Sequence, residues 1–148
     1  MSRNKPTKKK KLFNKKYSPD NLILYFTIFM AIKESYGGIP WVDWSLNFKM
    51  KDFDTIESFK QKHAKEITKH IFRQWIFFKQ WMQVKDYAHK LDIKIVGDIP
   101  FVIAFDSADV WANPHLFHLD DNRLPTVVAG VPPDYFSKTG QLWGNPLY

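Results

Sequence analysis

The fold prediction starts from residues 93–104, which read Ile93-Lys94-Ile95-Val96-Gly97-Asp98-Ile99-Pro100-Phe101-Val102-Ile103-Ala104. Apolar and β-branched residues dominate this run with little polar alternation, as expected for a strand covered on both faces in a parallel sheet. In folds that alternate strands and helices, ligands bind just beyond the carboxyl ends of such strands. We therefore expect a buried strand over residues 93–104 and a functional loop directly after it.

The loop that follows, residues 105–148, has the composition of a ligand-binding rim. Residues 105–114 bring carboxylates, small polar groups and an indole directly after the expected strand. Residues 125–148 place tyrosine, phenylalanine and tryptophan rings among prolines and glycines, which stiffen turns. A loop of this kind is able to hold aromatic faces toward a sugar.

Local signals before the strand predict helices. Ser18 as N-cap and Pro19 at the first helical position predict a helix to about Tyr36, where Gly37 and Gly38 end it. Trp41 and Trp44 follow, and we expect both indoles to belong to the core rather than to a sugar platform.

A second helical region begins near Asp54, which forms a capping-box pattern with Glu57. Between residues 64 and 90 there is no glycine or proline, and apolar side chains recur at helical spacing. They form two stripes, Ile67, Ile71, Trp75, Phe78 and Met82, and Phe77, Trp81, Val84 and Ala88. We expect a helix with both stripes buried, packed against a sheet and another helix.

Charge is concentrated at the start of the chain. The net charge is +7, but residues 1–16 hold eight of the 22 Lys and Arg and no acid. The rest of the chain has 14 basic and 15 acidic residues and is therefore almost neutral. Clustered cations bind nucleic acid by releasing counterions, yet no aromatic platform or recognition helix adjoins this run. We expect a disordered basic tail over residues 1–17 and no nucleic-acid partner, with a basic nucleic-acid-binding module as an alternative.

Other composition signals indicate a cytoplasmic chain without a cofactor. No cysteine is present, which excludes disulfides and thiolate metal sites and agrees with a reducing compartment. The apolar run from Leu22 to Ile32 is too short to span a bilayer, and no secretory cleavage site follows it. His115, His118 and Asp120 are a weak candidate zinc set, and we expect no metal there.

The chain resembles the 4-α-glucanotransferases (amylomaltase, disproportionating enzyme) of glycoside hydrolase family 77. The matching words occur in the family's order: Gly97-Asp98-x-Pro100, Asp106-Ser107-Ala108-Asp109-Val110-Trp111, Val127-Val128-Ala129-Gly130-Val131-Pro132-Pro133-Asp134-Tyr135-Phe136-Ser137 and Trp143-Gly144-Asn145-Pro146-Leu147-Tyr148. The segment from Tyr25 to Trp44 is similar to a family helix and the turn after it. The resemblance implies an α/β fold, a partial (β/α)8 barrel over residues 18–148, with insertion helices over 18–90, a barrel strand over 93–104 and a substrate-binding loop over 105–148.

The same resemblance implies a set of glucan-binding residues and no cofactor. Tyr135 and Phe136 match an acceptor-side aromatic pair over the active site, and Asp106 matches a carboxylate that contacts the sugar without covalent chemistry. Gln141, Trp143 and Asn145 match further members of the binding lip. For Trp143, packing beneath the loop is an equal alternative, and Asp134 is expected to serve turn geometry.

The catalytic half of the family pattern does not occur in this sequence. Retaining transfer needs two carboxyl groups about 5 Å apart. The family's Arg-x-Asp-His motif, which contains the nucleophile, is absent. We expect none of Asp98, Asp106 and Asp109 to act as nucleophile, and we expect Asp109 to cap the turn before Trp111. The chain is therefore identified as a 4-α-glucanotransferase fragment that is inactive alone and acts on maltodextrins in its parent; the alternative is a non-catalytic glucan-binding remnant.

Two small departures from the family pattern are visible. Residues 100–103 read Pro100-Phe101-Val102-Ile103, which moves the aromatic ring to the other side of the expected strand. The turn after Asp120 lacks the family's glycine, and we expect Asn122 to take the left-handed conformation instead.

Overall fold

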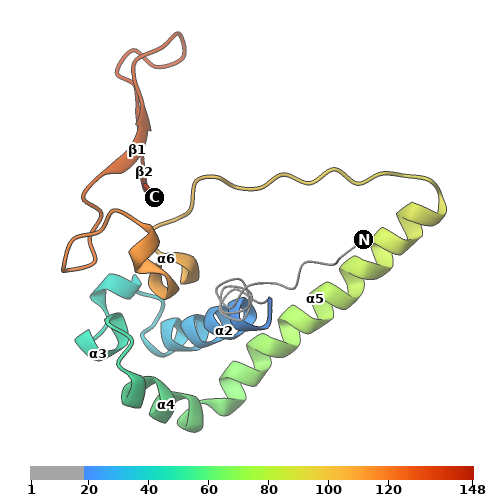
Figure 1. Ribbon diagram of the computed structural model, residues 1–148, viewed down its shortest axis with the longest axis horizontal. Coiled ribbons are helices and arrows are strands. Elements are labelled where there is room, and N and C mark those ends of the chain that lie inside the picture. The colour runs from blue at the N-terminus through green and yellow to red at the C-terminus, as the bar shows by residue number, and fades with distance from the viewer. Residues whose placement is uncertain (1–18) are drawn as a thin grey trace, which may run out of the picture.

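The computed structural model describes residues 19–148 and consists of helices followed by a two-stranded hairpin (Figure 1). The helices are α2 (Pro19–Ser35), α3 (Leu46–Lys49), α4 (Phe53–Lys62), α5 (Ala64–Lys90) and α6 (Ala108–Ala112), with 3-10 turns η1 (Trp41–Asp43) and η2 (Pro114–Leu116). Strands β1 (Val128–Val131) and β2 (Gln141–Pro146) pair antiparallel. The predicted basic tail and the predicted Ser18 cap lie outside the described residues.

One hydrophobic core holds the helices together. Helix α2 packs against α5 on one side and α6 on another, so that segments far apart in the sequence share this core. Its buried members are Ile28, Phe29, Ala31, Ile32, Trp41, Trp44, Phe59, Ile67, Val110 and Trp111. We call residues 19–70 and 105–117, which contain this core, the helical cluster. The core role predicted for Trp41 and Trp44 is confirmed, since their exposed fractions are 1% and 4%.

Helix α2 ends where the sequence predicted. Gly37 and Gly38 have φ angles of 70° and 86°, which favour glycine. The Gly38 N–H donates to the Lys33 carbonyl at 2.9 Å and closes the last turn. Within residues 19–148, every helix is too short or too polar to cross a membrane.

Helix α4 begins two residues earlier than the capping-box pattern predicted. The Asp52 carboxylate accepts hydrogen bonds from the Thr55 N–H at 3.0 Å and the Thr55 hydroxyl at 2.7 Å. These bonds hold the pKa of Asp52 below its usual value. The predicted cap, Asp54, is wrong because Asp54 already lies inside the helix, where its backbone is helical.

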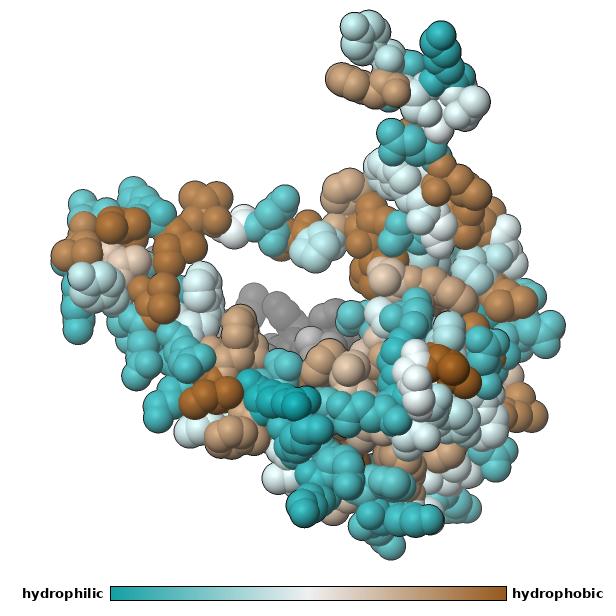
Figure 2. All heavy atoms as spheres, turned by 180° about the vertical axis from the view of Figure 1, so that it is seen from behind, coloured by the Kyte–Doolittle hydropathy of each residue, from teal (hydrophilic) through white to brown (hydrophobic). Residues whose placement is uncertain are grey.

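The outer half of α5 is exposed, in contrast to the prediction that both apolar stripes are buried. The helix itself is confirmed over Ala64–Lys90, but only Ile67 and Ala88 of the two stripes are buried. Trp75 is 54% exposed, and brown side chains are visible at the far end of this helix in Figure 2. The prediction is wrong because no sheet lies against this half of α5 among residues 19–148.

The strand predicted over residues 93–104 is not formed. Residues 91–104, which we call the connecting segment, run without a regular hydrogen-bond ladder from the end of α5 back toward α6 (Figure 1). Val96 is 93% exposed and Ile99 is 83% exposed. A strand buried on both faces requires neighbouring strands and covering helices, and residues 19–148 place none beside this segment.

Candidate functional site

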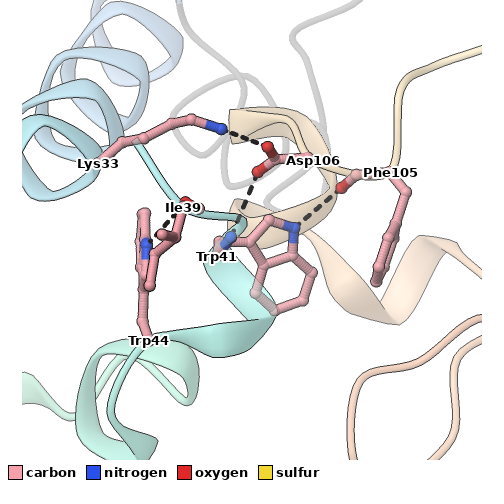
Figure 3. Close-up of polar contacts among 6 residues, drawn as sticks. All are labelled: Lys33, Ile39, Trp41, Trp44, Phe105 and Asp106. Atoms are coloured by element: carbon pink, nitrogen blue, oxygen red, sulfur yellow. Dashed lines mark hydrogen bonds and ion pairs between the residues drawn. The ribbon is translucent and has the colours of Figure 1, made fainter. Parts of the chain in front are cut away.

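Asp106 fastens the start of the predicted functional loop to helix α2. Its Oδ2 forms an ion pair with the Lys33 ammonium, which projects from the last turn of α2. Its Oδ1 accepts a hydrogen bond from the Trp41 N–H at 3.3 Å. Figure 3 shows the two contacts reaching the same carboxylate from α2 and η1.

The Trp41 side chain reinforces this attachment. Its indole Nε1 donates to the Phe105 carbonyl at 2.9 Å, and the centroids of the Trp41 and Phe105 rings lie 5.5 Å apart. The neighbouring indole of Trp44 donates to the Ile39 carbonyl at 3.3 Å (Figure 3). Because both indole N–H groups are used within the protein, both tryptophans act as core residues with satisfied polar atoms.

Helix α6 follows directly and is capped by Ser107. The Ser107 hydroxyl accepts from the Val110 N–H at 3.4 Å, so the cap predicted at Asp109 is wrong; Asp109 lies in the first turn of the helix. The Trp111 indole of α6 donates to the Phe48 carbonyl at 3.0 Å. The loop thus enters and leaves α6 with its orientation fixed by the helical cluster.

The predicted acceptor-side rings, Tyr135 and Phe136, lie in the turn between β1 and β2. The Asp134 carboxylate accepts from the N–H groups of Phe136 at 2.9 Å and Ser137 at 2.7 Å, which confirms its predicted turn role. The two rings are 96% and 88% exposed and stand perpendicular, with centroids 5.5 Å apart. Figure 1 shows the hairpin projecting away from the helices, so both rings face solvent.

The next two predicted residues lie together on β2. The Trp143 indole donates to the Gln141 side-chain oxygen at 3.0 Å, and Trp143 is 47% exposed. Of the two alternatives for Trp143, packing beneath the loop accounts for only part of its surface. A half-exposed ring with an amide beside it offers both a stacking face and hydrogen-bonding groups.

Asn145 lies at the base of the hairpin and bonds to the connecting segment. Its Nδ2 donates to the Ile103 carbonyl at 2.9 Å. Nearby, the Tyr148 hydroxyl donates to the Phe101 carbonyl at 2.6 Å, and the His118 N–H donates to the Leu147 carbonyl at 2.9 Å. These bonds hold the base of the hairpin against residues on both sides of α6.

The structure therefore places the six predicted glucan-binding residues in four separate locations. Tyr135 with Phe136 and Gln141 with Trp143 form two pairs on the hairpin, whereas Asp106 and Asn145 bond to the protein itself. None of the six lines the three open pockets that surround α2 and α4, of which one measures about 560 Å³.

Two of the remaining candidate carboxylates accept hydrogen bonds from nearby backbone N–H groups. The Asp98 carboxylate accepts from the adjacent Ile99 N–H at 2.7 Å, and the Asp120 carboxylate accepts from the Leu124 N–H at 2.8 Å. In the Asp120 turn the left-handed residue is Arg123, with φ of 68°, so the prediction for Asn122 is wrong by one position. Within residues 19–148, no three His, Cys, Asp or Glu side chains are arranged to hold a metal ion.

Two residues that the sequence did not single out have important contacts. Lys33 pairs with Asp106 as described above. His70 of α5 is buried, and among residues 19–148 its Nε2 has no hydrogen-bond partner, although the Glu34 carboxylate lies 3.3 Å away. The only sequence signal for either contact is the Lys33-Glu34 pair at the end of a helix, which resembles many solvent-exposed pairs.

Comparison with known proteins places these features in one family. The family profile described as 4-alpha-glucanotransferase matches residues 2–148. The 4-alpha-glucanotransferase of Thermus thermophilus is 51% identical over 123 residues, which cover 83% of this chain and 25% of the relative. That of Clostridium butyricum is 47% identical over 124 residues, which cover 83% of this chain and 26% of the relative.

A solved structure agrees with the sequence comparisons. The amylomaltase from Streptococcus agalactiae in complex with acarbose superposes with a TM-score of 0.84 at 35% identity. The match covers 96% of this chain and 29% of that chain. This chain therefore spans about a quarter of the length of the curated relatives it matches.

Proposed function

The chain belongs to the 4-alpha-glucanotransferase family, and on that premise we propose that it forms the acceptor-side glucan-binding rim of such an enzyme. The parent activity is the transfer of α-1,4-glucan segments between maltodextrins by a retaining double displacement. The observation that carries the proposal is the pair of rings at the hairpin turn. Tyr135 and Phe136 are almost fully exposed, perpendicular, and backed by a turn that Asp134 fixes.

Such rings suit the apolar faces of glucose units. A sugar that stacks on one ring and meets the other edge-on loses water from both, and the exclusion of water favours transfer to a sugar hydroxyl over hydrolysis. Gln141 and Trp143 add an amide and a third ring on strand β2 of the same hairpin. All four residues lie on one hairpin, and the proposal is that one oligosaccharide chain contacts them together.

We further propose that this polypeptide alone does not turn over substrate. A retaining transfer needs two facing carboxyl groups about 5 Å apart, one as nucleophile and one as acid/base. Asp98 and Asp106 are occupied by contacts with the protein, and Asp109 lies in the first turn of α6. Asp109 lines a pocket between α2 and α6 that neither Asp98 nor Asp106 lines, which supports the proposal that none is a nucleophile.

The proposed position in the fold is a section of a (β/α)8 barrel. Under this proposal, the connecting segment is a barrel strand once neighbours are supplied, and the helices over residues 18–90 form an insertion. The apolar composition of residues 93–104 and the superposition on an amylomaltase support it. A cytoplasmic location and the absence of a nucleic-acid partner stay predictions from the sequence.

Calorimetric titration of the 148-residue chain with maltodextrin tests the proposal. We expect Tyr135→Ala and Phe136→Ala each to weaken binding by about fivefold, since one stacked ring contributes on the order of 1 kcal/mol. Phe53→Ala is the matched control, because Phe53 is an exposed ring on α4, remote from the hairpin. Equal losses in all three variants, or no binding by the unmodified chain, would contradict the proposal.

Glucose release from maltotriose separates a transferase fragment from an active enzyme. We expect no release by the purified chain. Release that Asp98→Asn or Asp109→Asn abolishes would overturn the predicted inactivity and identify a nucleophile. Binding without release fits both the fragment and the alternative of a non-catalytic glucan-binding remnant, and release on adding the remaining part of a relative favours the fragment.

A further inference from the structure

Asp106 and Asn145 match sugar-contacting residues of the family, yet the structure shows both bonded to the protein. We propose that they are positioning residues which, with Lys33, set where the hairpin and its rings lie. The inference rests on the proposed function only where maltodextrin binding is measured. The position of the hairpin is measurable without a ligand.

The Asp106 carboxylate is occupied from two directions. The Lys33 ammonium pairs with Oδ2, and the Trp41 N–H donates to Oδ1. Trp41 is almost fully buried, so its N–H has no access to water and depends on this acceptor. Withdrawing the carboxylate to bind a sugar would leave a buried N–H unpaired and a lysine without its counter-charge, which opposes such a movement.

The same tryptophan also holds the residue before Asp106. The Trp41 indole donates to the Phe105 carbonyl, and the Trp41 backbone N–H donates to the Asp106 carboxylate. One residue therefore bonds to two consecutive loop residues. Figure 3 shows these contacts lying side by side between η1 and the loop. The position of residues 105–106 is therefore defined by the helical cluster.

Asn145 connects residues 103–106 to the hairpin. Its side-chain amide donates to the Ile103 carbonyl, two residues before Phe105. The Tyr148 hydroxyl bonds to the Phe101 carbonyl on the same segment. A continuous series of contacts thus leads from α2 through Asp106 and residues 103–105 to β2, which carries Gln141 and Trp143 and adjoins the turn with Tyr135 and Phe136.

The cysteine-free sequence allows a direct measurement of the hairpin position. Ser58→Cys on α4 and Lys138→Cys at the hairpin turn introduce two exposed sites for spin labels, and pulsed electron paramagnetic resonance gives the distance distribution between them. We expect one narrow peak for the labelled parent chain. Asn145→Ala, Lys33→Met and Asp106→Asn should each broaden or shift that peak, with Lys33→Arg restoring it.

The double variant and a control sharpen the test. Because Lys33 and Asp106 act through one contact, the double variant Lys33→Met, Asp106→Asn should change the distribution no more than either single variant. Asp109→Asn removes the same charge three residues along the chain, where no side-chain bond is formed, and should leave the peak unchanged. Both measurements are made well below the melting temperature, so that only folded protein contributes.

Each outcome decides between positioning and direct sugar contact. A broadened peak in Asp106→Asn and Asn145→Ala that Asp109→Asn does not show supports the inference. An unchanged peak overturns it, and weaker maltodextrin binding with an unchanged peak identifies Asp106 and Asn145 as sugar ligands. If the unmodified chain binds no maltodextrin, the proposed function fails, while the distance measurement still tests the positioning.

Discussion

The helical cluster and the part of the chain over residues 71–104, which we call the outer arm, have similar apolar side chains and opposite environments. Trp41 and Trp111 in the cluster are almost fully buried, whereas Trp75 in the outer arm is half exposed and Val96 is almost fully exposed. Both regions contain aromatic residues at helical or strand spacing. The difference teaches that residue type and spacing define an element, and that contacts between distant segments decide whether it is buried.

The contacts of the two regions show how this difference arises. In the cluster, ring and polar contacts join segments 60 or more residues apart, as in Trp41 with Phe105 at a separation of 64 and Trp111 with Phe48 at 63. In the outer arm, the ring pairs of the described residues join near neighbours on one helix, Phe72 with Trp75 and Phe77 with Phe78. With only such local pairs, each of these four residues stays about half exposed.

The largest effect on stability is expected when one tryptophan in each region is replaced by alanine. Trp111→Ala should lower the free energy of unfolding by about 3–5 kcal/mol, because it leaves a cavity in the core and an unpaired Phe48 carbonyl. Trp75→Ala removes a similar ring that is half exposed, and its cost should be at most about 1 kcal/mol. Urea unfolding followed by circular dichroism measures both values.

Equal effects of the two substitutions would break the comparison. A large cost for Trp75→Ala would mean that the outer arm packs as tightly as the cluster in solution. A small cost for Trp111→Ala would mean that the core does not hold α6 to α2. Phe72→Ala gives a second measurement in the outer arm, since Phe72 is also exposed on α5.

The sequence predicted helix ends and one turn well, inside and outside the cluster, because their signals are local. The glycines after α2 and the absence of helix breakers over residues 64–90 defined the ends of long helices within a few residues. The turn at Asp134 followed from the preference of Asp for bonding the next backbone N–H groups. Errors of one or two positions at Asp52, Ser107 and Arg123 arose where several residues of similar chemistry stand together.

What the sequence could not predict depends on the rest of the fold. A run such as residues 93–104 is a strand only when other strands offer their backbone groups, so its composition alone cannot establish pairing. The Lys33 contact with Asp106 joins residues 73 apart, and nothing local to either residue indicates it. The resemblance implied a glucan-binding role for the ring pair Tyr135 and Phe136, which stays a prediction, but it could not show that Asp106 and Asn145 bond to the protein.

A smaller effect, confined to the cluster, concerns the cap of α4. Asp52→Ala should lower the melting temperature, because the Thr55 N–H loses its acceptor, whereas Asp54→Ala should have little effect. The pKa of Asp52 is lowered in the folded protein by the Thr55 hydrogen bonds. Its stabilisation is therefore present above the unfolded pKa, about 3.9, and is lost as the pH falls through the lower folded value.

Melting curves between neutral pH and pH 2 test this assignment. The difference between the unmodified chain and Asp52→Ala should be largest at neutral pH and should shrink at the acidic end, whereas Asp54→Ala should show no such trend. If Asp54→Ala is the more damaging variant, the capping box predicted from the sequence is the correct cap and the start of α4 lies two residues later.

The smallest effect on stability is expected in the outer arm, at Ile99→Lys. Ile99 is largely exposed in the connecting segment, so the substitution removes no buried contact and should change the free energy of unfolding by less than about 0.5 kcal/mol.

The effect of Ile99→Lys should be on association, because an extended apolar segment with unpaired backbone groups is a template for pairing with another chain. A positive charge at its centre opposes that pairing, and the added lysine should shift sedimentation toward the monomer. Asn47→Lys adds the same charge on exposed α3 and should leave sedimentation unchanged. A marked loss of stability in Ile99→Lys would show that the connecting segment is packed within the chain, and the contrast between the cluster and the outer arm would then end at residue 90.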